Sequence, residues 1–369
     1  MKIWTTGFIS TLTILGILSC NNNQISTPDD ADLPTNRPPV AWSGTSREIS
    51  DDQVYFGDLN ITKAETNVYW KFAEQTAGIY DFEEVRNVVD ILKNNGVDEI
   101  SLALYPENAL YNDVRITRST VPRNERQWTA YKNFLTALVN DFKNDVQFYQ
   151  IVREMNPARF LGTAEDYADF LVFSANIIKA VDASAKIAFA AMPYELCIGT
   201  DRENFIAEVI QHLPDNKNYF DAIDIHFHML PQDMGVVLSV ENGFEYVETA
   251  YEFFRDQLSD TRYTNVINFF ETSSYSAEVG DINNTLVQTE EEQATDIEKR
   301  LSVLAQKGVY WINLEGGIYQ RRYFMFDASG NINSSLRYFE HTGLIWNPEV
   351  NSGKEGTKKA YDTVKTWNH

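Results

Sequence analysis

Two glutamates stand at the ends of apolar segments that have the composition of buried strands. Glu154 comes shortly after VQFYQIV at 146–152, and Glu271 ends VINFFE at 266–271. Two carboxyl groups that face each other can hydrolyse a glycosidic bond with retention, because one protonates the leaving oxygen while the other attacks the anomeric carbon. Each could instead be an ordinary solvated carboxylate, so the elements that position them decide between these two interpretations.

A second polar group follows the alternation of a strand. Asp224, His226 and His228 lie two residues apart in DAIDIHFH, so their side chains share one face of a strand. A His-x-His pair on one face can ligate zinc. The sequence offers no obvious further ligand cluster, so we favour hydrogen bonds from the histidines near a substrate, and we expect no metal and no cofactor.

Strand-like and helix-like segments alternate along the chain from about residue 40. Six strand candidates are clear, at 99–106, 146–152, 186–192, 221–227, 266–271 and 309–316, and two weaker ones lie at 40–44 and 67–70. The connections have room for helices, and Thr163 with Asp166 and Thr289 with Glu292 have the spacing of capping boxes. No GxGxxG or P-loop follows an early strand. The pattern therefore predicts an α/β protein, a (β/α)8 TIM barrel formed as a single domain by residues 40–369.

A barrel would bring the candidate residues together. Catalytic groups of such barrels lie at the carboxyl ends of the strands, where Glu154 and Glu271 would face each other from the fourth and seventh strands. Aromatic residues near other strand ends either stack on sugar rings or belong to the core, and the sequence leaves both possibilities open. These residues are Trp70, Tyr105, Tyr194, Tyr275 and Trp311.

Composition narrows the classes of partner. The chain has 369 residues, with 31 basic and 53 acidic side chains and a formal net charge of −22. Such a charge repels phosphate backbones and anionic membrane surfaces, so nucleic-acid binding is disfavoured and we expect no nucleic acid as a partner. We expect a monomer.

The first residues have the pattern of an export signal. MKIWTTGFISTLTILGILSC has one lysine, a short apolar stretch and the small Ser19 before Cys20, which resembles a bacterial lipoprotein signal. We expect residues 1–19 to be removed, Cys20 to carry the lipid as the sole membrane anchor, and residues 20–39 to be a polar tether. A transmembrane helix is the alternative, but the apolar run is short and interrupted by polar residues. Cys197, far away in sequence, is expected to be a buried thiol.

Several ordered segments are similar to clan A of the glycoside hydrolases, the retaining (β/α)8 enzymes with catalytic carboxylates on strands 4 and 7. The resemblance covers about Trp70 to Lys365. It rests on 70–97 (WKFAEQTAGIYDFEEVRNVVDILKNNGV), LALYP, VQFYQIVREMNP, DAIDIHFH, INFFETS and the closing TGLIWNPEVNSGKEGTKKAYDTVK. It implies that Glu154 is the acid/base and Glu271 the nucleophile.

The segment around Glu154 departs from the clan's pattern. Arg153 stands where the clan has an asparagine that binds the sugar 2-hydroxyl, and Met155 stands where proline is usual. Arg153 could donate hydrogen bonds to the substrate, or it could pair with Glu154 and hinder its protonation. Asn156 could supply the missing amide.

Two functions remain. The first is a retaining glycoside hydrolase that acts on oligo- or polysaccharides at the cell surface or in the periplasm. Its expected substrate-binding residues are Arg153, Asn156, Trp70, Tyr105, His226, His228, Tyr275 and Trp311. The alternative is a non-catalytic barrel that binds glycans for an uptake system.

Overall fold

The computed structural model describes residues 37–111, 121–155, 160–215, 217–228, 243–276, 287–315, 318–319, 341–348 and 354–369. Cys20, the signal segment and Asn156 lie outside these residues. None of the described helices combines the length and apolar composition that a membrane crossing requires.

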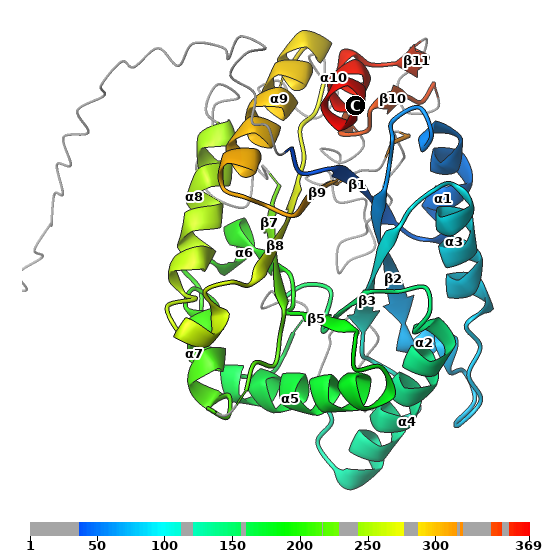
Figure 1. Ribbon diagram of the computed structural model, residues 1–369, viewed down its shortest axis with the longest axis vertical. Coiled ribbons are helices and arrows are strands. Elements are labelled where there is room, and N and C mark those ends of the chain that lie inside the picture. The colour runs from blue at the N-terminus through cyan, green and yellow to red at the C-terminus, as the bar shows by residue number, and fades with distance from the viewer. Residues whose placement is uncertain are drawn as a thin grey trace, which may run out of the picture. The chain divides into compact units, whose positions relative to one another are not determined.

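Parallel strands form a closed barrel (Figure 1). The strands are β1 (Val40–Gly44), β2 (Lys63–Tyr69), β3 (Glu99–Tyr105), β4 (Phe148–Gln150), β5 (Lys186–Ala188), β6 (Met192–Pro193), β7 (Ala222–Phe227), β8 (Ile267–Thr272) and β9 (Trp311–Leu314). Neighbours pair in the order β5-β4-β3-β2-β1-β9-β8-β7-β6, and a pairing of β5 with β7 closes the circle. β5 and β6 are successive pieces beside β7, so the barrel has the eight strand positions that the sequence predicts.

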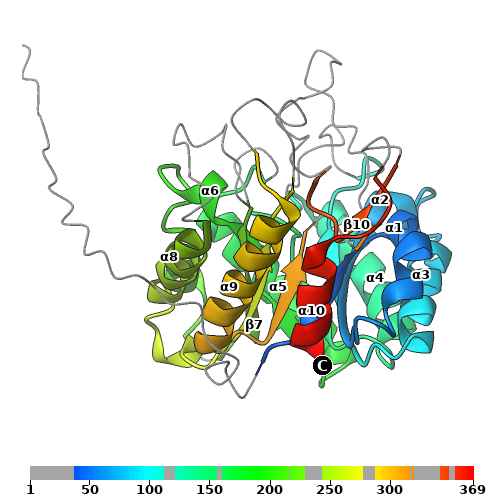
Figure 2. The same ribbon diagram turned by 90° about the horizontal axis from the view of Figure 1, so that it is seen from above.

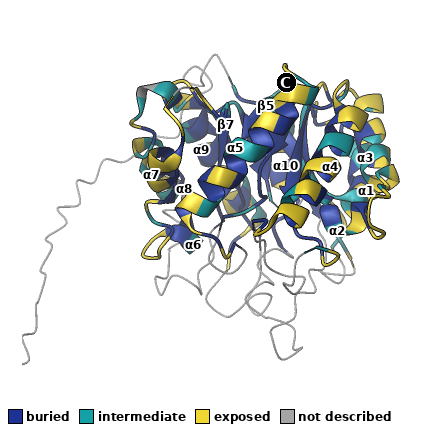
Figure 3. Ribbon diagram, turned by 90° about the horizontal axis from the view of Figure 1, so that it is seen from below, coloured by how far each residue is buried: buried dark blue, intermediate teal, exposed yellow. Residues whose placement is uncertain are grey.

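Helices surround the strands (Figure 2). They are α1 (Ser46–Asp52), α2 (Trp70–Ala73), α3 (Glu83–Asn94), α4 (Glu125–Phe142), α5 (Ala164–Val181), α6 (Tyr194–Cys197), α7 (Phe205–His212), α8 (Gly243–Asp256), α9 (Glu290–Gln306) and α10 (Lys359–Asn368), with 3-10 turns at Gln53–Tyr55 and Thr261–Tyr263. β10 (Ile345–Trp346) and β11 (Gly356–Thr357) form a small antiparallel pair. The helices bury their inner faces and expose their outer ones (Figure 3), as amphipathic helices over a barrel do.

The predicted helix starts are confirmed. Thr163 accepts a hydrogen bond from the backbone of Asp166 before α5, and Thr289 accepts one from Glu292 before α9; both capping boxes are complete. The second strand begins earlier than predicted, at Lys63, because the apolar signal of 67–70 includes Trp70, which starts α2.

Apolar side chains fill the barrel at the amino ends of its strands. Phe269 and Trp311 stack with ring centroids 4.0 Å apart, and Phe148 meets both edge-on. Small residues opposite these rings complete the layer, namely Ala41, Ala188 and Ala222. Because this layer closes the barrel at one end, the polar residues farther along each strand gather at the carboxyl end.

Candidate active site

The chain after β4 is bent so that it leaves the sheet. Val152 has φ of 74°, a left-handed conformation that a β-branched residue adopts only at an energetic cost. The backbone N–H of Arg153 donates to the Leu104 carbonyl at 3.0 Å, and that of Met155 donates to the Ala191 carbonyl at 2.8 Å. These bonds to the neighbouring strand segments fix Arg153 and Glu154 at the mouth of the barrel.

Glu271 lies at the centre of a buried charged network. Its side chain is 1% exposed, and its Oε2 lies 2.8 Å from Nη2 of Arg153. Its Oε1 lies 3.2 Å from Nδ1 of His226 and 3.3 Å from Nε2 of His228. Burial alone would raise the pKa of this carboxyl, but Arg153 and the two histidines outweigh it and hold the pKa of Glu271 well below its usual range. Glu271 is therefore ionised at neutral pH, as a nucleophile must be.

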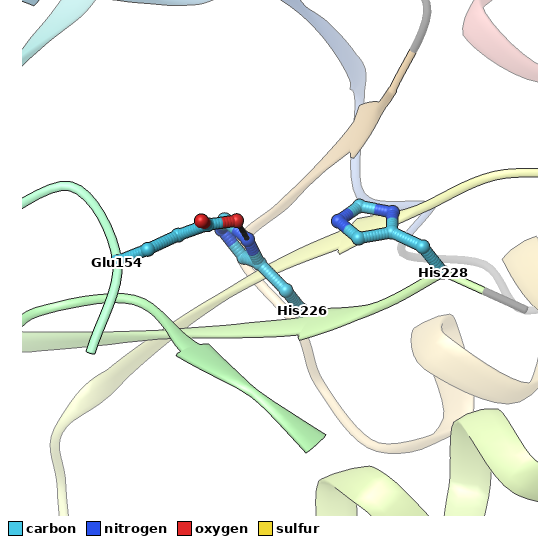
Figure 4. Close-up of side chains that lie close together, drawn as sticks. All are labelled: Glu154, His226 and His228. Carbon is cyan, nitrogen blue, oxygen red and sulfur yellow. Dashed lines mark ion pairs between the residues drawn. The ribbon is translucent and has the colours of Figure 1, made fainter. Parts of the chain in front are cut away.

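Glu154 and Glu271 both lie close to the same ring nitrogen of His226. Glu154 Oε1 lies 3.5 Å from Nδ1 of His226 (Figure 4). The same nitrogen lies 3.2 Å from Glu271 Oε1. The two carboxylate oxygens are therefore no farther apart than the sum of these distances. That limit accommodates the ~5 Å of retaining glycosidases and excludes separations near ~9 Å.

The guanidinium of Arg153 pairs with carboxylates on other strands. Nη2 faces Glu271, and Nη1 lies 2.8 Å from Oε1 of Glu65 and 3.7 Å from Asp224. Of the two roles considered for Arg153, the structure shows ion pairing, but among the described residues its ion-pair partners are these three carboxylates and not Glu154. Its Nη1 also lies 3.2 Å from Nε2 of His226. The concern that Arg153 would suppress protonation of Glu154 has no support in this geometry.

Glu65 is a site residue that the sequence analysis missed. It lies on β2, is 1% exposed, and burial raises its pKa to about 8 although Arg153 acts in the opposite direction. A glutamate in the middle of the buried segment KAETNVY was the available signal, because charged side chains are almost never fully buried without a partner.

Two further carboxyl groups belong to the same end of the barrel. Burial raises the pKa of Glu195 to about 7, and its Oε1 accepts a 2.7 Å hydrogen bond from the backbone N–H of His228. Burial and the charge of Glu271 raise the pKa of Glu315, just after β9, to about 7. Asp224 accepts from Gln150 at 2.8 Å and lies 3.0 Å from Nε2 of His226.

The predicted aromatic residues divide into core and site. Trp70 is fully buried against Tyr111 and Phe134, and Trp311 belongs to the apolar layer of the barrel, so both are core residues. Tyr275 is 1% exposed and close to acidic residues of α9. Tyr194 packs against aromatic residues of β7 and α8.

Tyr105 differs from these because it is partly exposed at the end of β3. Its ring stacks on Tyr69 at 4.3 Å, and the two residues are register partners on β3 and β2. Tyr69 shares the strand face of Glu65, four residues earlier. The two rings form an aromatic surface beside the charged network, and Tyr69 was not predicted.

The same mouth contains a set of potential metal ligands. One ligand atom from each of Glu154, His226 and His228 lies within 4.8 Å of the others, and Figure 4 shows the three side chains converging. The predicted buried thiol is confirmed nearby: Cys197 is fully buried, and its Sγ lies 3.3 Å from the Met155 carbonyl oxygen.

No family model matches the chain, and no curated protein matches its sequence. Solved structures with the same fold include a family 39 glycoside hydrolase from the gut symbiont Bacteroides cellulosilyticus WH2, with a TM-score of 0.61 and 14% identity over 90% of this chain and 63% of that one. An exo-β-1,4-mannosidase from Opitutaceae bacterium strain TAV5 has a TM-score of 0.63 and 12% sequence identity, over 93% of this chain and 60% of that one. An endo-β-1,4-mannanase from Thermotoga petrophila has a TM-score of 0.58 and 10% sequence identity, over 90% of this chain and 76% of that one.

The chain thus spans less than two thirds of the first and second of these proteins, and it shares the (β/α)8 barrel fold with all three.

Proposed function

We propose that this protein is a retaining glycoside hydrolase with Glu271 as nucleophile and Glu154 as acid/base. The proposal rests on one observation: Glu271 and Glu154 both lie close to His226, but they differ in burial and in charged neighbours. Glu271 is buried and held ionised by Arg153, whereas Glu154 has a side chain that is 14% exposed and borders the opening. The two environments suit the two roles of a double displacement.

The reaction follows from these positions. Glu154 protonates the glycosidic oxygen while Glu271 attacks the anomeric carbon, so the leaving alcohol departs and a glycosyl ester forms on Glu271. Glu154 then removes a proton from a water molecule, which attacks the same carbon and releases Glu271. In this scheme Arg153 is a positioning residue: it holds Oε2 of Glu271 and keeps the nucleophile ionised before the substrate arrives.

The substrate class is an oligo- or polysaccharide. The stacked rings of Tyr69 and Tyr105 offer an apolar face of the kind on which sugar rings pack, beside the carboxylates that would act on the bond. We further propose that the enzyme is exported and anchored by lipid on Cys20, which would place it among extracellular or periplasmic glycans.

A non-catalytic glycan-binding barrel is the second candidate. It is favoured by Arg153, because the guanidinium stands where the clan has an asparagine and makes a buried ion pair with the proposed nucleophile. Binding without hydrolysis is the outcome that would support this candidate.

A panel of dinitrophenyl glycosides separates the two functions. The activated leaving group needs no proton, so formation of the glycosyl ester depends on the nucleophile and not on an acid. The wild type should hydrolyse at least one sugar of the panel, Glu271→Gln should lose that activity, and the exposed Glu165→Gln on α5 should retain it as the control. Glycan binding by calorimetry without turnover of any activated sugar would refute the catalytic assignment.

A further inference from the structure

The side chains at the ends of β4, β7 and β8 form more than a pair of carboxylates. His226 is the register partner of Glu271, and His228 follows on the same face of β7. Glu271 Oε1 therefore lies between two imidazole nitrogens, at 3.2 Å from His226 Nδ1 and 3.3 Å from His228 Nε2. Glu154 Oε1 reaches the same Nδ1 at 3.5 Å. Both carboxylates thus approach the imidazole nitrogens at this end of the barrel.

Three of the separations between these ligand atoms are close to those of a tetrahedral coordination shell. A zinc ion with bonds of about 2.0 Å to nitrogen and oxygen places its ligand atoms about 3.3 Å apart. The three separations given above lie close to that value. One ligand atom from each of Glu154, His226 and His228 also lies within 4.8 Å of the others (Figure 4).

His226 carries an independent sign of a missing ligand. It is fully buried, and its Nδ1 makes no hydrogen bond to any described residue although two carboxylate oxygens lie 3.2 and 3.5 Å away. The oxygens are close to Nδ1 but do not meet hydrogen-bond geometry. Such an arrangement is the one expected when the nitrogen and the oxygens are directed at a common centre between them.

Neighbouring residues hold His226 in place. Its Nε2 lies 3.0 Å from Asp224, which accepts a hydrogen bond from Gln150, and 3.2 Å from Nη1 of Arg153, so Nδ1 is the nitrogen that is left to face the proposed centre. Arg153 holds Oε2 of Glu271, which leaves Oε1 as the single ligand atom of that carboxylate. The two histidines help to keep Glu271 ionised, so a divalent cation bound by them would take the place of the positive charge that they supply to the buried carboxylates.

We propose that Glu154, His226, His228 and Glu271 form a transition-metal site, with zinc as the favoured ion because two imidazoles and two carboxylates are ligands that zinc accepts. The site goes beyond hydrolysis: metal binding takes the free oxygen of Glu271, so the metal-loaded and the hydrolytic forms exclude each other. The His-x-His pair is a possible zinc motif in the sequence, but no further ligand cluster is obvious there, because Glu154 and Glu271 lie far from the pair along the chain.

Metal binding tests the proposal without any requirement for activity. The chelator-treated full chain is dialysed against Zn²⁺, and bound metal is counted by elemental analysis while affinity is measured by calorimetry. We expect one zinc per chain and a raised unfolding temperature with zinc. His226→Gln and His228→Gln should lose this binding, and the exposed His212→Ala on α7 should keep it.

Two further measurements separate ligands from residues that only support the fold. Asp224→Asn should weaken zinc binding by ~10- to 100-fold without abolishing it, as substitutions behind a ligating histidine do. Co²⁺ in the wild type should give the strong visible absorption of a tetrahedral ion, and the two His→Gln variants should lack it while keeping a wild-type circular dichroism spectrum. The proposal is overturned if the wild type takes up no zinc, or if folded His226→Gln and His228→Gln bind it as the wild type does.

Discussion

Replacement of Arg153 by methionine tests whether the charged network exists as described. The guanidinium is 8% exposed and lies 2.8 Å from both Glu271 and Glu65. Removal of one partner of a buried ion pair leaves an uncompensated charge and costs ~3–5 kcal/mol. Burial raises the pKa of Glu65 to about 8, so this carboxyl can take up a proton when Arg153 is removed, and the penalty then falls mainly on the ionised Glu271.

Urea denaturation at pH 7, followed by tryptophan fluorescence, measures this penalty. Arg153→Met should lower the free energy of unfolding by ~3 kcal/mol or more. The control Arg123→Met removes an Arg–Asp pair whose arginine is 54% exposed, and it should cost no more than ~1 kcal/mol. The addition of Glu271→Gln to Arg153→Met should recover part of the loss, because the uncompensated charge is then gone. A loss below ~1 kcal/mol for Arg153→Met would refute the buried network.

The same substitution predicts a change in the pH dependence of hydrolysis. Arg153 is a principal cause of the lowered pKa of Glu271, so its removal raises that pKa. The nucleophile must be ionised, and the acidic limb of kcat/KM should therefore move to higher pH in Arg153→Met. An acidic limb that does not move would show that Arg153 does not control the ionisation of Glu271.

Three other predictions concern separate parts of the chain. Glu154→Gln should hydrolyse a dinitrophenyl glycoside far better than a natural glycoside, because only the latter needs a proton donor; equal losses on both substrates would contradict its acid role. Lys358 is buried and donates to the His341 carbonyl at 2.9 Å, and burial lowers its pKa to about 7 from 10.5. The free energy of unfolding of the wild type should therefore rise with pH between these two values. Lys358→Met should raise the unfolding temperature most near pH 7 and progressively less toward pH 10. A gain that does not depend on pH would show that Lys358 does not titrate in this range. Cys20→Ala should move the protein from the membrane to the soluble fraction after cell disruption, and retention in the membrane would exclude the lipid anchor.

The barrel itself could be predicted from local signals. Apolar runs such as 221–227 and 266–271 are buried on both faces, and capping boxes such as that of Thr289 mark where the intervening helices begin. Each of these signals lies within a few residues of the element it specifies. The weakest strand prediction, 67–70, was displaced because the apolar Trp70 belongs to the next helix.

The network of the site could be predicted only in part. The alternation of side chains along a strand places His226 and His228 on one face. It cannot show that Arg153 forms ion pairs with Glu271 and Glu65 and not with its neighbour Glu154. Which carboxylates Arg153 contacts depends on the bend at Val152 and on the register of the strands, and both are properties of the folded sheet. The sequence also could not separate aromatic residues of the core from those near the site, since Trp70 has the same local pattern whether it faces sugar or core.

The central claim is that Glu271 forms a covalent bond to the sugar. The panel sugar that supports turnover should be prepared as its 2-deoxy-2-fluoro dinitrophenyl glycoside, because the fluorine slows hydrolysis of the intermediate. Intact-protein mass spectrometry should show the addition of one glycosyl group, and peptide fragmentation should place it on Glu271, while Glu271→Gln stays unlabelled. A label on another residue, or turnover of the parent sugar with inversion at the anomeric carbon, would contradict the assignment.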